Sequence, residues 1–569
     1  MARKPANLIY GVEDRPSAAA SLVLGLQHAV LLIGSVTTVV VFGEEAGLTH
    51  EQVQGLVTVA LLGGGLTTIL QALPKSPLGS GYFCPHTTSF IYFQASVMAA
   101  KIGGLPLVFG MTVLAGGFEA LLSRLMRRLR PFFPAEVSGL VVTMVGISLA
   151  PYSIRSIAGL YGGESTLNPS VILVGLATFS LMVGLNVWGN AFLRLYSIFI
   201  GICFGYGLAY SFGLVTVEQM KGIHAQPLLA LPMVGSLGLS FDVSFLLPFL
   251  IASTCASLKT MGDLVTCQKV NDADWKRPDM DSVSRGLAAE GLGTIVTGLL
   301  GGMGQASNSS NIGLALASGA TSRRIGYVTG AIFIILAFLP KIASALAVLP
   351  RPVIGAVTLF AACVMIVTGM SIIMSRMLDT RKIFMIGLSF ILGMSVEAVP
   401  ELYRGSPAHL EPVFGSALAL AAVSALILNL ILRIGIASKV VLELASGLQS
   451  GNEIYGFFEK MGSAWGARRE IVYRAMAAVN EFYEAAAGLG LSAGRMLITV
   501  RFEEFNLDVE IAYQGREMLF PQARPSEEEL LKDDSALARL SGFLITHMAD
   551  RIKTEVKGDQ CRILLHFDH

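Results

Sequence analysis

The stretch GGMGQASNSSNIGLALASG, residues 301–319, interrupts an apolar region of the chain with glycine, serine and asparagine. A second stretch of the same kind, PLGSGYFCPHTTSF, covers residues 77–90. Both are too polar for a helix that faces lipid, and unwound backbone at membrane depth survives only where it is buried in protein or lines a cavity. They are either two loops between helices or two interrupted membrane segments, and we favour the second interpretation.

The composition is that of a membrane protein. Of the 569 residues, 53% are hydrophobic and 14% are charged, against roughly 25% charged residues in an ordinary soluble domain; the mean hydropathy is +0.64. This excludes a soluble enzyme, and the net charge of +1 without a long basic run gives no indication of nucleic-acid binding. The six cysteines are scattered without a CxxC pair, so we expect no disulfide, no metal site and no cofactor. No apolar core follows the first basic residues, and we expect no cleaved signal peptide.

About fourteen apolar runs between residues 18 and 433 approach the roughly 20 residues that a helix needs to cross a bilayer. Their centres lie near Ala29, Leu61, Phe93, Leu114, Thr143, Phe179, Phe204, Ser253, Thr294, Leu314, Phe333, Ala362, Ile391 and Ala422. Stretch 77–90 falls at the third run and stretch 301–319 at the tenth, which are equivalent positions if seven segments occur twice. Paired interrupted segments in two halves of a membrane protein indicate a transport site at the middle of the bilayer.

Basic residues predict the orientation of the chain. They gather before the first run and in the even-numbered links between runs, at Arg3, Lys4, Arg124, Arg127, Arg128, Arg130, Lys269, Lys276, Arg277, Arg285, Arg323, Arg324, Arg376, Arg381 and Lys382. The odd-numbered links, such as GEEAGLTHEQ, are poor in them. The positive-inside rule therefore places both termini in the cytoplasm, in a multi-pass protein of the cytoplasmic (inner) membrane.

Polar and ionisable side chains lie inside several apolar runs, where they are unfavourable unless they have a partner or a function. They are Gln27 and His28 in the first run, Lys259 and Asp263 in the eighth, Glu290 in the ninth, and Ser307, Asn308, Ser309, Ser310 and Asn311 in the tenth. Lys259 and Asp263 are one helical turn apart, so they could also form a purely structural ion pair. His28 alone is more often a hydrogen-bonded core residue than a proton relay.

Five motifs, in order along residues 18–433, carry a family resemblance. They are LGLQH with Gln27 and His28, HTTSF with Ser89 and Phe90, MGDLVT with Asp263, LAAEGLGT with Glu290, and SNIGLALASGATSRRIGY with Asn311. Together they resemble the nucleobase–ascorbate transporters, also called xanthine/uracil permeases. The match covers about three quarters of the chain.

The resemblance implies an all-α polytopic membrane protein of two inverted seven-segment repeats, divided into a core and a gate domain. Short strands in segments three and ten would meet at the substrate, and helix N-termini would point into the site. It implies alternating-access transport of a nucleobase or related oxopurine (xanthine, urate or uracil class), with a proton or sodium as coupling ion, in a lipid-embedded homodimer. The implied substrate-binding residues are Gln27, His28, Ser89, Phe90, Lys259, Asp263, Glu290, Ser309, Ser310 and Asn311, of which His28, Lys259, Asp263 and Glu290 are also coupling candidates.

The chain departs from this family at the position that matters most. Members usually present a glutamate one turn before the aspartate of segment eight, and here that position is Lys259. The glutamine or glutamate that opens the segment-ten signature is Ser310, and a later threonine is Ser318. An ammonium has three donors and no acceptor, so it cannot reproduce the contacts of a glutamate.

Three interpretations of Lys259 remain open. It binds an anionic or acceptor-rich ligand such as a deprotonated oxopurine, or it pairs with Asp263 or Glu290 in place of a coupling cation, or the site is disabled and the protein is a ligand sensor. We favour transport with altered specificity or coupling. An anion transporter of the sulphate-permease type has the same architecture, but the Gln-His and Asn-x-Gly motifs argue against it.

After Arg433 the composition becomes that of a soluble domain. Helical and alternating patterns predict the order helix–strand–strand–helix–strand–strand, ending in a hairpin at Gly558-Asp559. This resembles the ATPase domain of anti-sigma-factor and histidine kinases, with Glu481 as the basic glutamate. The magnesium-ligating asparagine is replaced by Ala485 and the adenine-loop aspartate by Tyr513, so we expect an inactive regulatory or dimerising domain.

The sequence thus predicts four parts. They are a cytoplasmic N-terminal segment (1–17), a transporter-like membrane domain (18–433), a linker helix (434–454) and a cytoplasmic α+β domain (455–569).

Overall fold

The computed structural model describes residues 3–6, 8–74, 76–129, 135–160, 167–232, 238–275, 278–407, 411–432, 434, 438–444, 451–492, 494–503, 506–521, 523–525 and 534–568. The sequence predictions that concern Arg130, Lys276, Arg277 and Arg433 lie outside these residues. The chain forms two compact units. We call Met1–Leu129, Val137–Met370 and Leu388–Ala425 the helical unit, and Arg130–Glu136, Ser371–Gly387 and Leu426–His569 the C-terminal unit.

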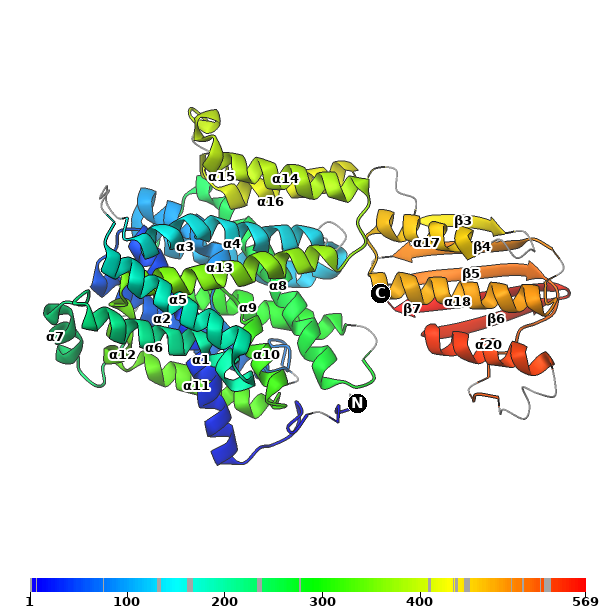
Figure 1. Ribbon diagram of the computed structural model, residues 1–569, viewed down its shortest axis with the longest axis horizontal. Helices are drawn as coiled ribbons and strands as arrows, with labels where there is room; N and C mark the ends of the chain where they lie inside the picture. The colour runs from blue at the N-terminus through cyan, green and yellow to red at the C-terminus, as the bar shows by residue number, and fades with distance from the viewer. Residues whose placement is uncertain are drawn as a thin grey trace. The chain divides into compact units, whose positions relative to one another are not determined.

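Helices account for nearly all regular structure up to residue 432 (Figure 1). The α-helices are α1 (Ala18–Glu45), α2 (His50–Ala72), α3 (Phe93–Leu129), α4 (Ala135–Ala158), α5 (Pro169–Trp188), α6 (Ala191–Ser211), α7 (Val217–Ala225), α8 (Leu246–Asn271), α9 (Met280–Leu300), α10 (Ser309–Ala317), α11 (Arg323–Ala337), α12 (Pro340–Ala347), α13 (Arg351–Met374), α14 (Thr380–Ala398), α15 (Glu411–Phe414) and α16 (Ala417–Leu432). Three short 3₁₀ helices are η1 (Phe90–Tyr92), η3 (Val243–Phe245) and η4 (Pro400–Tyr403).

All the predicted centres of the apolar runs fall within helices. Within the described residues, seven helices are long and apolar enough to cross a membrane, or eight if α11 and α12, which bend by 81°, form one broken span. The third and fourth predicted runs share one element, α3, because its break at Gly104 is short. There the backbone has a φ of 70° and a ψ of −173°, a left-handed conformation that glycine adopts readily, and Pro106 follows.

The two interrupted stretches contain the predicted short strands, and these strands meet. Strand β1 (His86–Thr88) pairs antiparallel with β2 (Gln305–Ser307), with Thr87 opposite Ala306. All six residues are buried. The hydrogen bonds between the two strands satisfy their backbone N–H and C=O groups, which could not bond to water inside a membrane.

Each strand ends where a capped helix begins. The Ser89 hydroxyl accepts from the Ile91 N–H at 3.2 Å, and the Asn308 side chain accepts from the Asn311 N–H at 3.1 Å. Ser89 also donates its backbone N–H to the Gly304 carbonyl at 3.1 Å. The N-terminal ends of η1 and α10, which carry partial positive charge, therefore lie at the same crossing.

The N-terminal segment is attached to the helical unit by backbone pairing. Tyr10 donates its N–H to the Gly319 carbonyl at 2.9 Å and accepts from the Thr321 N–H at 2.8 Å, while Arg3 donates to Asp272. A hydrogen bond from Lys4 and one from the Gly11 N–H hold the pKa of Asp14 below its usual value. The segment thus links the end of α8 to the turn between α10 and α11.

The C-terminal unit contains a five-stranded antiparallel sheet, in the order β3-β4-β5-β7-β6. Its elements are β3 (Lys439–Leu444), α17 (Gly451–Trp465), α18 (Arg469–Gly488), β4 (Met496–Glu503), β5 (Asn506–Gln514), α20 (Asp534–Met548), β6 (Arg551–Lys557) and β7 (Gln560–Asp568). Helix α18 packs between α17 and α20 along one face of the sheet (Figure 1). The predicted order from α18 to β7 agrees with this arrangement, including the turn at Gly558.

The predicted linker helix at 434–454 is wrong. Residues 439–444 form strand β3, which pairs with β4 with Leu442 opposite Ile498, and α17 adds Ile454 and Phe458 to the core of the unit. Lys439, Val441 and Glu443 are exposed, whereas Val440, Leu442 and Leu444 turn inward. This alternation is typical of an edge strand with one buried face.

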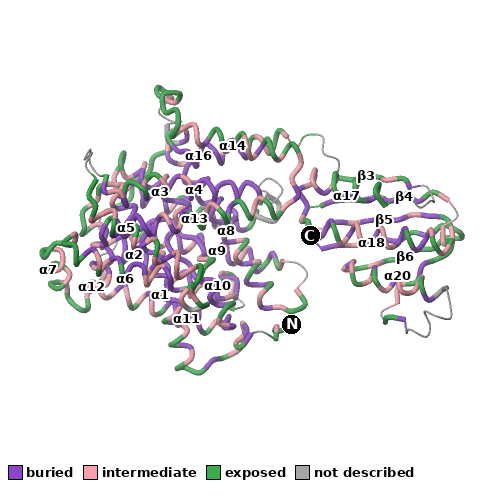
Figure 2. Tube along the Cα trace, viewed as in Figure 1, coloured by how far each residue is buried: buried purple, intermediate pink, exposed green. Residues whose placement is uncertain are grey.

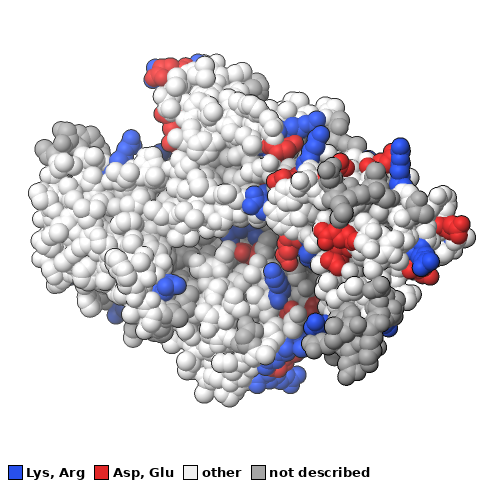
Figure 3. All heavy atoms as spheres, turned by 45° about the vertical axis from the view of Figure 1, so that its right-hand side comes forward, with Lys and Arg blue, Asp and Glu red and all other residues white. Residues whose placement is uncertain are grey.

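Burial and charge agree with a membrane location for the helical unit. Figure 2 shows an interior of buried residues, whereas the short helix α7 contains none. On the face shown in Figure 3, a broad area on the left is nearly free of charged side chains. Large apolar side chains such as Leu173, Trp188 and Ile391 are more than half exposed, which suits a surface that contacts lipid.

Candidate functional site

Lys259 lies at the crossing of β2 and α8. Its ammonium donates to the Asp263 carboxylate at 3.0 Å, one turn further along α8, and to the Ser307 carbonyl at 2.5 Å. The two side chains are 25% and 14% exposed, so the ion pair is shielded but not sealed. The predicted i,i+4 pair is therefore present, and Lys259 does not face lipid.

Asp263 is the acceptor around which this cluster is built. Besides Lys259, it accepts from the Ser307 hydroxyl at 2.5 Å and from the Ser309 hydroxyl at 2.9 Å. Ser309 is the first residue of α10, so the carboxylate also lies at a helix N-terminus, where negative charge is stabilised. The three donors to Asp263 are concentrated on Oδ2, whereas Oδ1 accepts only from the Ser309 hydroxyl that the two oxygens share.

Glu290 joins the cluster indirectly. It is fully buried on α9 and accepts from the Thr260 hydroxyl at 2.8 Å. Thr260 in turn accepts from the Ser307 N–H at 3.1 Å. Glu290, Thr260, Ser307 and Asp263 thus form a continuous hydrogen-bonded chain.

Ser307 and Thr260 are central to this cluster, although neither is among the site residues that the sequence predicts. Ser307 was visible as part of the polar run 307–311, but nothing in the sequence shows that it ends β2 opposite Lys259. Thr260 adjoins Lys259 and looks like any threonine in an apolar helix. Its role follows only from the packing of α8 against β2 and α9.

A second pair links the first and tenth segments. His28 on α1 and Asn311 on α10 are both buried and are hydrogen-bonded at 2.8 Å between Nδ1 and Oδ1. The ring of Phe83 packs edge-on against the imidazole, with 4.6 Å between centroids. This arrangement holds α10 against α1.

The remaining predicted residues lie nearby without joining either hydrogen-bonded group. Ser89 caps η1 beside β2, and Phe90 is half-buried in contact with Phe93. Ser310 is exposed in the first turn of α10, and Gln27 is half-buried, with its backbone carbonyl accepting from Tyr196. Within the described part of the chain, no three His, Cys, Asp or Glu side chains are close enough to hold a metal ion.

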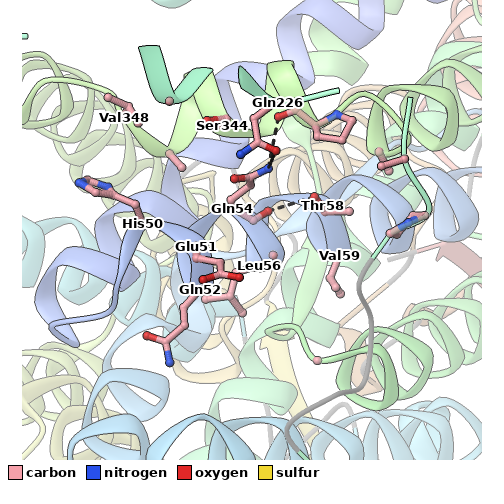
Figure 4. A pocket seen from close by; sticks show the side chains of 18 of the residues that line it. His50, Glu51, Gln52, Gln54, Leu56, Thr58, Val59, Gln226, Ser344 and Val348 are labelled. Carbon is pink, nitrogen blue, oxygen red and sulfur yellow. Dashed lines mark hydrogen bonds between the residues drawn. The ribbon is translucent and has the colours of Figure 1, made fainter. Parts of the chain in front are cut away.

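The helical unit also contains a pocket of about 790 Å³, and none of the predicted site residues line it. It is bordered by α2, α7 and α12, with Leu105, Phe109 and Leu300 on its apolar side. In Figure 4 the Gln54 side chain reaches Gln226, with 3.4 Å between amide nitrogen and oxygen. The same amide donates to the Pro340 carbonyl at 3.4 Å, so Gln54 connects α2 to the ends of α7 and α12.

Curated relatives of the chain are permeases. It is 30% identical over 430 residues to "Putative purine permease CPE0397" of Clostridium perfringens, covering 75% of this chain and 93% of that protein. It is 28% identical over 438 residues to the xanthine permease XanP of Escherichia coli, covering 74% and 94%. The uric acid transporter UacT of Escherichia coli is 27% identical over 438 residues, covering 73% and 88%.

A solved structure, the transmembrane domain of the cyanobacterial bicarbonate transporter BicA, is similar at 15% identity over 75% of this chain and 99% of that chain. Its TM-score of 0.46 is too low to support an argument. The family model Xan_ur_permease, described as a permease family, matches residues 19–402. Because this match covers more than half of the 569 residues, the chain is a multi-pass membrane permease and not an enzyme, and it belongs to the Xan_ur_permease family.

Proposed function

We propose that the protein is a secondary active transporter of an oxopurine of the xanthine or urate class. The family match and the names of the relatives support the substrate class. The observation that carries the proposal is the cluster of Lys259, Asp263 and Ser309 where β1, β2 and the N-terminus of α10 converge. This is the place where paired interrupted segments hold substrate in a membrane transporter.

The chemistry of the cluster favours a ligand with acceptors. Lys259 has three donors: two bond Asp263 and the Ser307 carbonyl, and the third makes only a long contact of 3.4 Å with the Ser307 hydroxyl, which a ligand could replace. The donors on Asp263 are concentrated on Oδ2, and its charge is balanced by Lys259, so the cluster presents a cationic donor next to a carboxylate that is already paired. A deprotonated, anionic oxopurine such as urate therefore matches this site better than neutral uracil, because its charge adds to the hydrogen bond from the ammonium.

We also propose that the helices and strands of the helical unit make up the predicted fourteen segments, as two repeats of seven. The first repeat would contain α1, α2, β1 with η1 and the start of α3, the rest of α3, α4, α5 and α6. The second would contain α8, α9, β2 with α10, α11, α13, α14 and α16. In each, the third segment is a strand followed by a helix, and the two strands pair antiparallel, as an inverted relationship requires. The cytoplasmic termini and the homodimer remain parts of this proposal.

Uptake by proteoliposomes that contain the full-length protein tests the substrate class. We expect radiolabelled urate, which is an anion at neutral pH, to enter at least about tenfold faster than uracil, because pairing with the Lys259 ammonium adds a charge-assisted hydrogen bond of about 1.5–3 kcal/mol. Lys259→Met should remove this preference. If uracil enters as fast as urate and Lys259→Met changes neither rate, the proposal of an anionic ligand is contradicted. Binding without uptake would instead identify a ligand sensor.

We infer that the C-terminal unit has a regulatory or dimerising role without ATP hydrolysis. Tyr513 is buried against Phe482, with 5.2 Å between ring centroids, and its hydroxyl donates to the Arg516 carbonyl at 3.0 Å. Burial raises the pKa of the Tyr513 phenol, so it stays neutral. A bulky neutral side chain therefore stands where the resemblance implies an adenine-binding aspartate, and Ala485 offers no magnesium ligand.

Thermal unfolding of the full-length protein tests this inference. A site occupied at a hundred times its Kd stabilises the folded state by about 2.7 kcal/mol, enough to raise the melting temperature by several degrees. With about 1 mM ATP and magnesium we expect no shift, because both ligand-binding side chains are replaced. A magnesium-dependent rise would overturn the inactive assignment.

A further inference from the structure

Two buried carboxyl groups lie behind the Lys259 cluster, close enough to interact electrostatically. Glu119 on α3 and Glu290 on α9 are both 0% exposed. Glu119 Oε1 accepts a short hydrogen bond from the Tyr92 hydroxyl, and Glu290 Oε1 accepts from Thr260 at 2.8 Å. The second oxygen of each carboxyl, Oε2, meets no donor at hydrogen-bonding geometry within the described residues.

The packing of α3 on α9 brings these groups together. A Cβ added to Gly116 would lie 2.7 Å from the Gly291 carbonyl, and one added to Gly291 would lie 2.6 Å from the Ala120 nitrogen. Glu119 directly precedes Ala120, and Glu290 directly precedes Gly291. Glu119 and Glu290 thus adjoin, in sequence, residues where the two helix backbones approach closely, and the two carboxyls interact electrostatically.

Other groups that face the pair supply little positive charge. They are Tyr92 from η1, Cys255, Lys259 and Asp263 from α8, and the Thr294 hydroxyl from α9. Lys259 is the one cation among them, and its nearest carboxylate is Asp263. Two ionised carboxylates without a cation of their own would be strongly unfavourable in such a place, since an unpaired buried charge costs several kcal/mol.

We propose that Glu119 and Glu290 form a proton-binding site in which the two carboxyls share one proton. The shared proton lies on one Oε2 and supplies a donor to two oxygens that have no partner at hydrogen-bonding geometry within the described residues, with the Thr294 hydroxyl as a further neighbour of Glu119. Two carboxyls that share a site titrate as a pair, with one of them kept neutral by the charge of the other. Glu119 is thus a proton-holding residue that the sequence motifs do not include.

The pair is connected to both strands of the substrate region. Glu290 reaches Ser307 and Lys259 through Thr260, and Glu119 reaches η1 through Tyr92. When the pair loses its proton, the added negative charge competes with an anionic ligand for Lys259. This coupling rests on the proposed function: binding of an anionic oxopurine takes up a proton, and its affinity falls as the pH rises.

Ligand-induced proton uptake by the purified full-length protein tests the site. Urate is added in weakly buffered solution with a pH-sensitive dye, and its Kd is measured from about pH 6 to about pH 9. We expect the wild type to take up protons and its Kd to rise up to tenfold per pH unit, the change that one linked proton produces. Glu119→Gln should bind urate with little or no proton uptake and a flatter pH profile, and Tyr92→Phe should shift that profile. The control Glu51→Gln removes an exposed carboxylate from the first turn of α2 and should behave as wild type.

A measurement without ligand separates this inference from the substrate proposal. The folded pair keeps a proton that the unfolded chain releases, so the folded state binds more protons and stability should fall as the pH rises. Glu119→Gln should flatten the dependence of the melting temperature on pH relative to wild type and Glu51→Gln. If urate does not bind, the dependence of the melting temperature on pH still tests whether the two carboxyls share a proton. Wild-type pH dependence in Glu119→Gln would overturn the shared proton, and sodium-dependent stabilisation lost in that variant would identify a sodium site instead.

Discussion

Replacing Gly116 by leucine should prevent the helical unit from folding, whereas the same replacement at the next residue, Gly117, should be tolerated. At Gly116 an added Cβ would lie 2.6 Å from the Ile295 nitrogen and 2.7 Å from the Gly291 carbonyl. Both are backbone atoms of α9, which cannot move aside as a side chain does, so α3 and α9 would have to separate. Overpacking of a core costs about 1–3 kcal/mol even where side chains can adjust, and we expect a larger loss here, of about 4–5 kcal/mol.

Gly117 is a matched control because it is also a glycine and is the next residue of α3. It is exposed, and nothing lies within 4 Å of its added Cβ. Leucine should be neutral or slightly stabilising there, since glycine in a helix interior is less favourable by about 1 kcal/mol. Size-exclusion profiles and melting temperatures of the two purified variants provide the measurement. Similar melting temperatures for both would show that α3 and α9 do not approach as closely as described.

Breaking the Lys259–Asp263 pair should reduce transport by about a hundredfold or more, which corresponds to at least 2.7 kcal/mol of lost interaction. Asp263→Asn leaves the ammonium without an anionic partner, facing the carbonyl and hydroxyl oxygens of Ser307, and Lys259→Met leaves a carboxylate with two serine hydroxyls. Removing one partner of a buried pair costs about 3–5 kcal/mol, and partial exposure of both groups lowers our expectation for stability to about 1–3 kcal/mol. Uptake in proteoliposomes and melting temperatures measure the two effects separately.

The double variant distinguishes an ion pair from two independent residues. Lys259→Met with Asp263→Asn removes both charges, so it should be more stable than the sum of the single losses predicts, by about 1 kcal/mol or more. Transport should stay low, because the ligand donor is absent. Thr266→Ala, one turn further along the exposed face of α8, is the control and should change neither property. Strictly additive losses of stability would contradict direct pairing.

Much of the helical unit was predictable because membrane insertion depends on local hydropathy. The centres of the apolar runs, the interrupted stretches 77–90 and 301–319, and the pairing of their strands agree with the structure. The C-terminal strands β4 to β7 followed from alternation. Strand β3 was misjudged as part of a helix, because a short segment beside residues of helical pattern gains its identity from pairing with β4.

The candidate site was predicted less completely. Lys259, Asp263 and Glu290 stood out because ionisable residues are rare inside apolar runs. Glu119 did not, since it lies only a few residues before Arg124, where acidic and basic residues are ordinary at a membrane boundary. Its burial follows from the glycine contact between α3 and α9, which no pattern within α3 reveals.

The sequence by itself determined that the protein spans a membrane, where its helices and interrupted stretches lie, and which ionisable residues need partners. These properties depend on residues close together along the chain, so hydropathy, turn chemistry and residue type are enough to predict them. Only the tertiary structure decided which partners they find: Ser307 for Lys259, Thr260 for Glu290, and Glu119 beside Glu290. Those contacts join segments far apart in the chain, and their geometry depends on how closely whole helices pack.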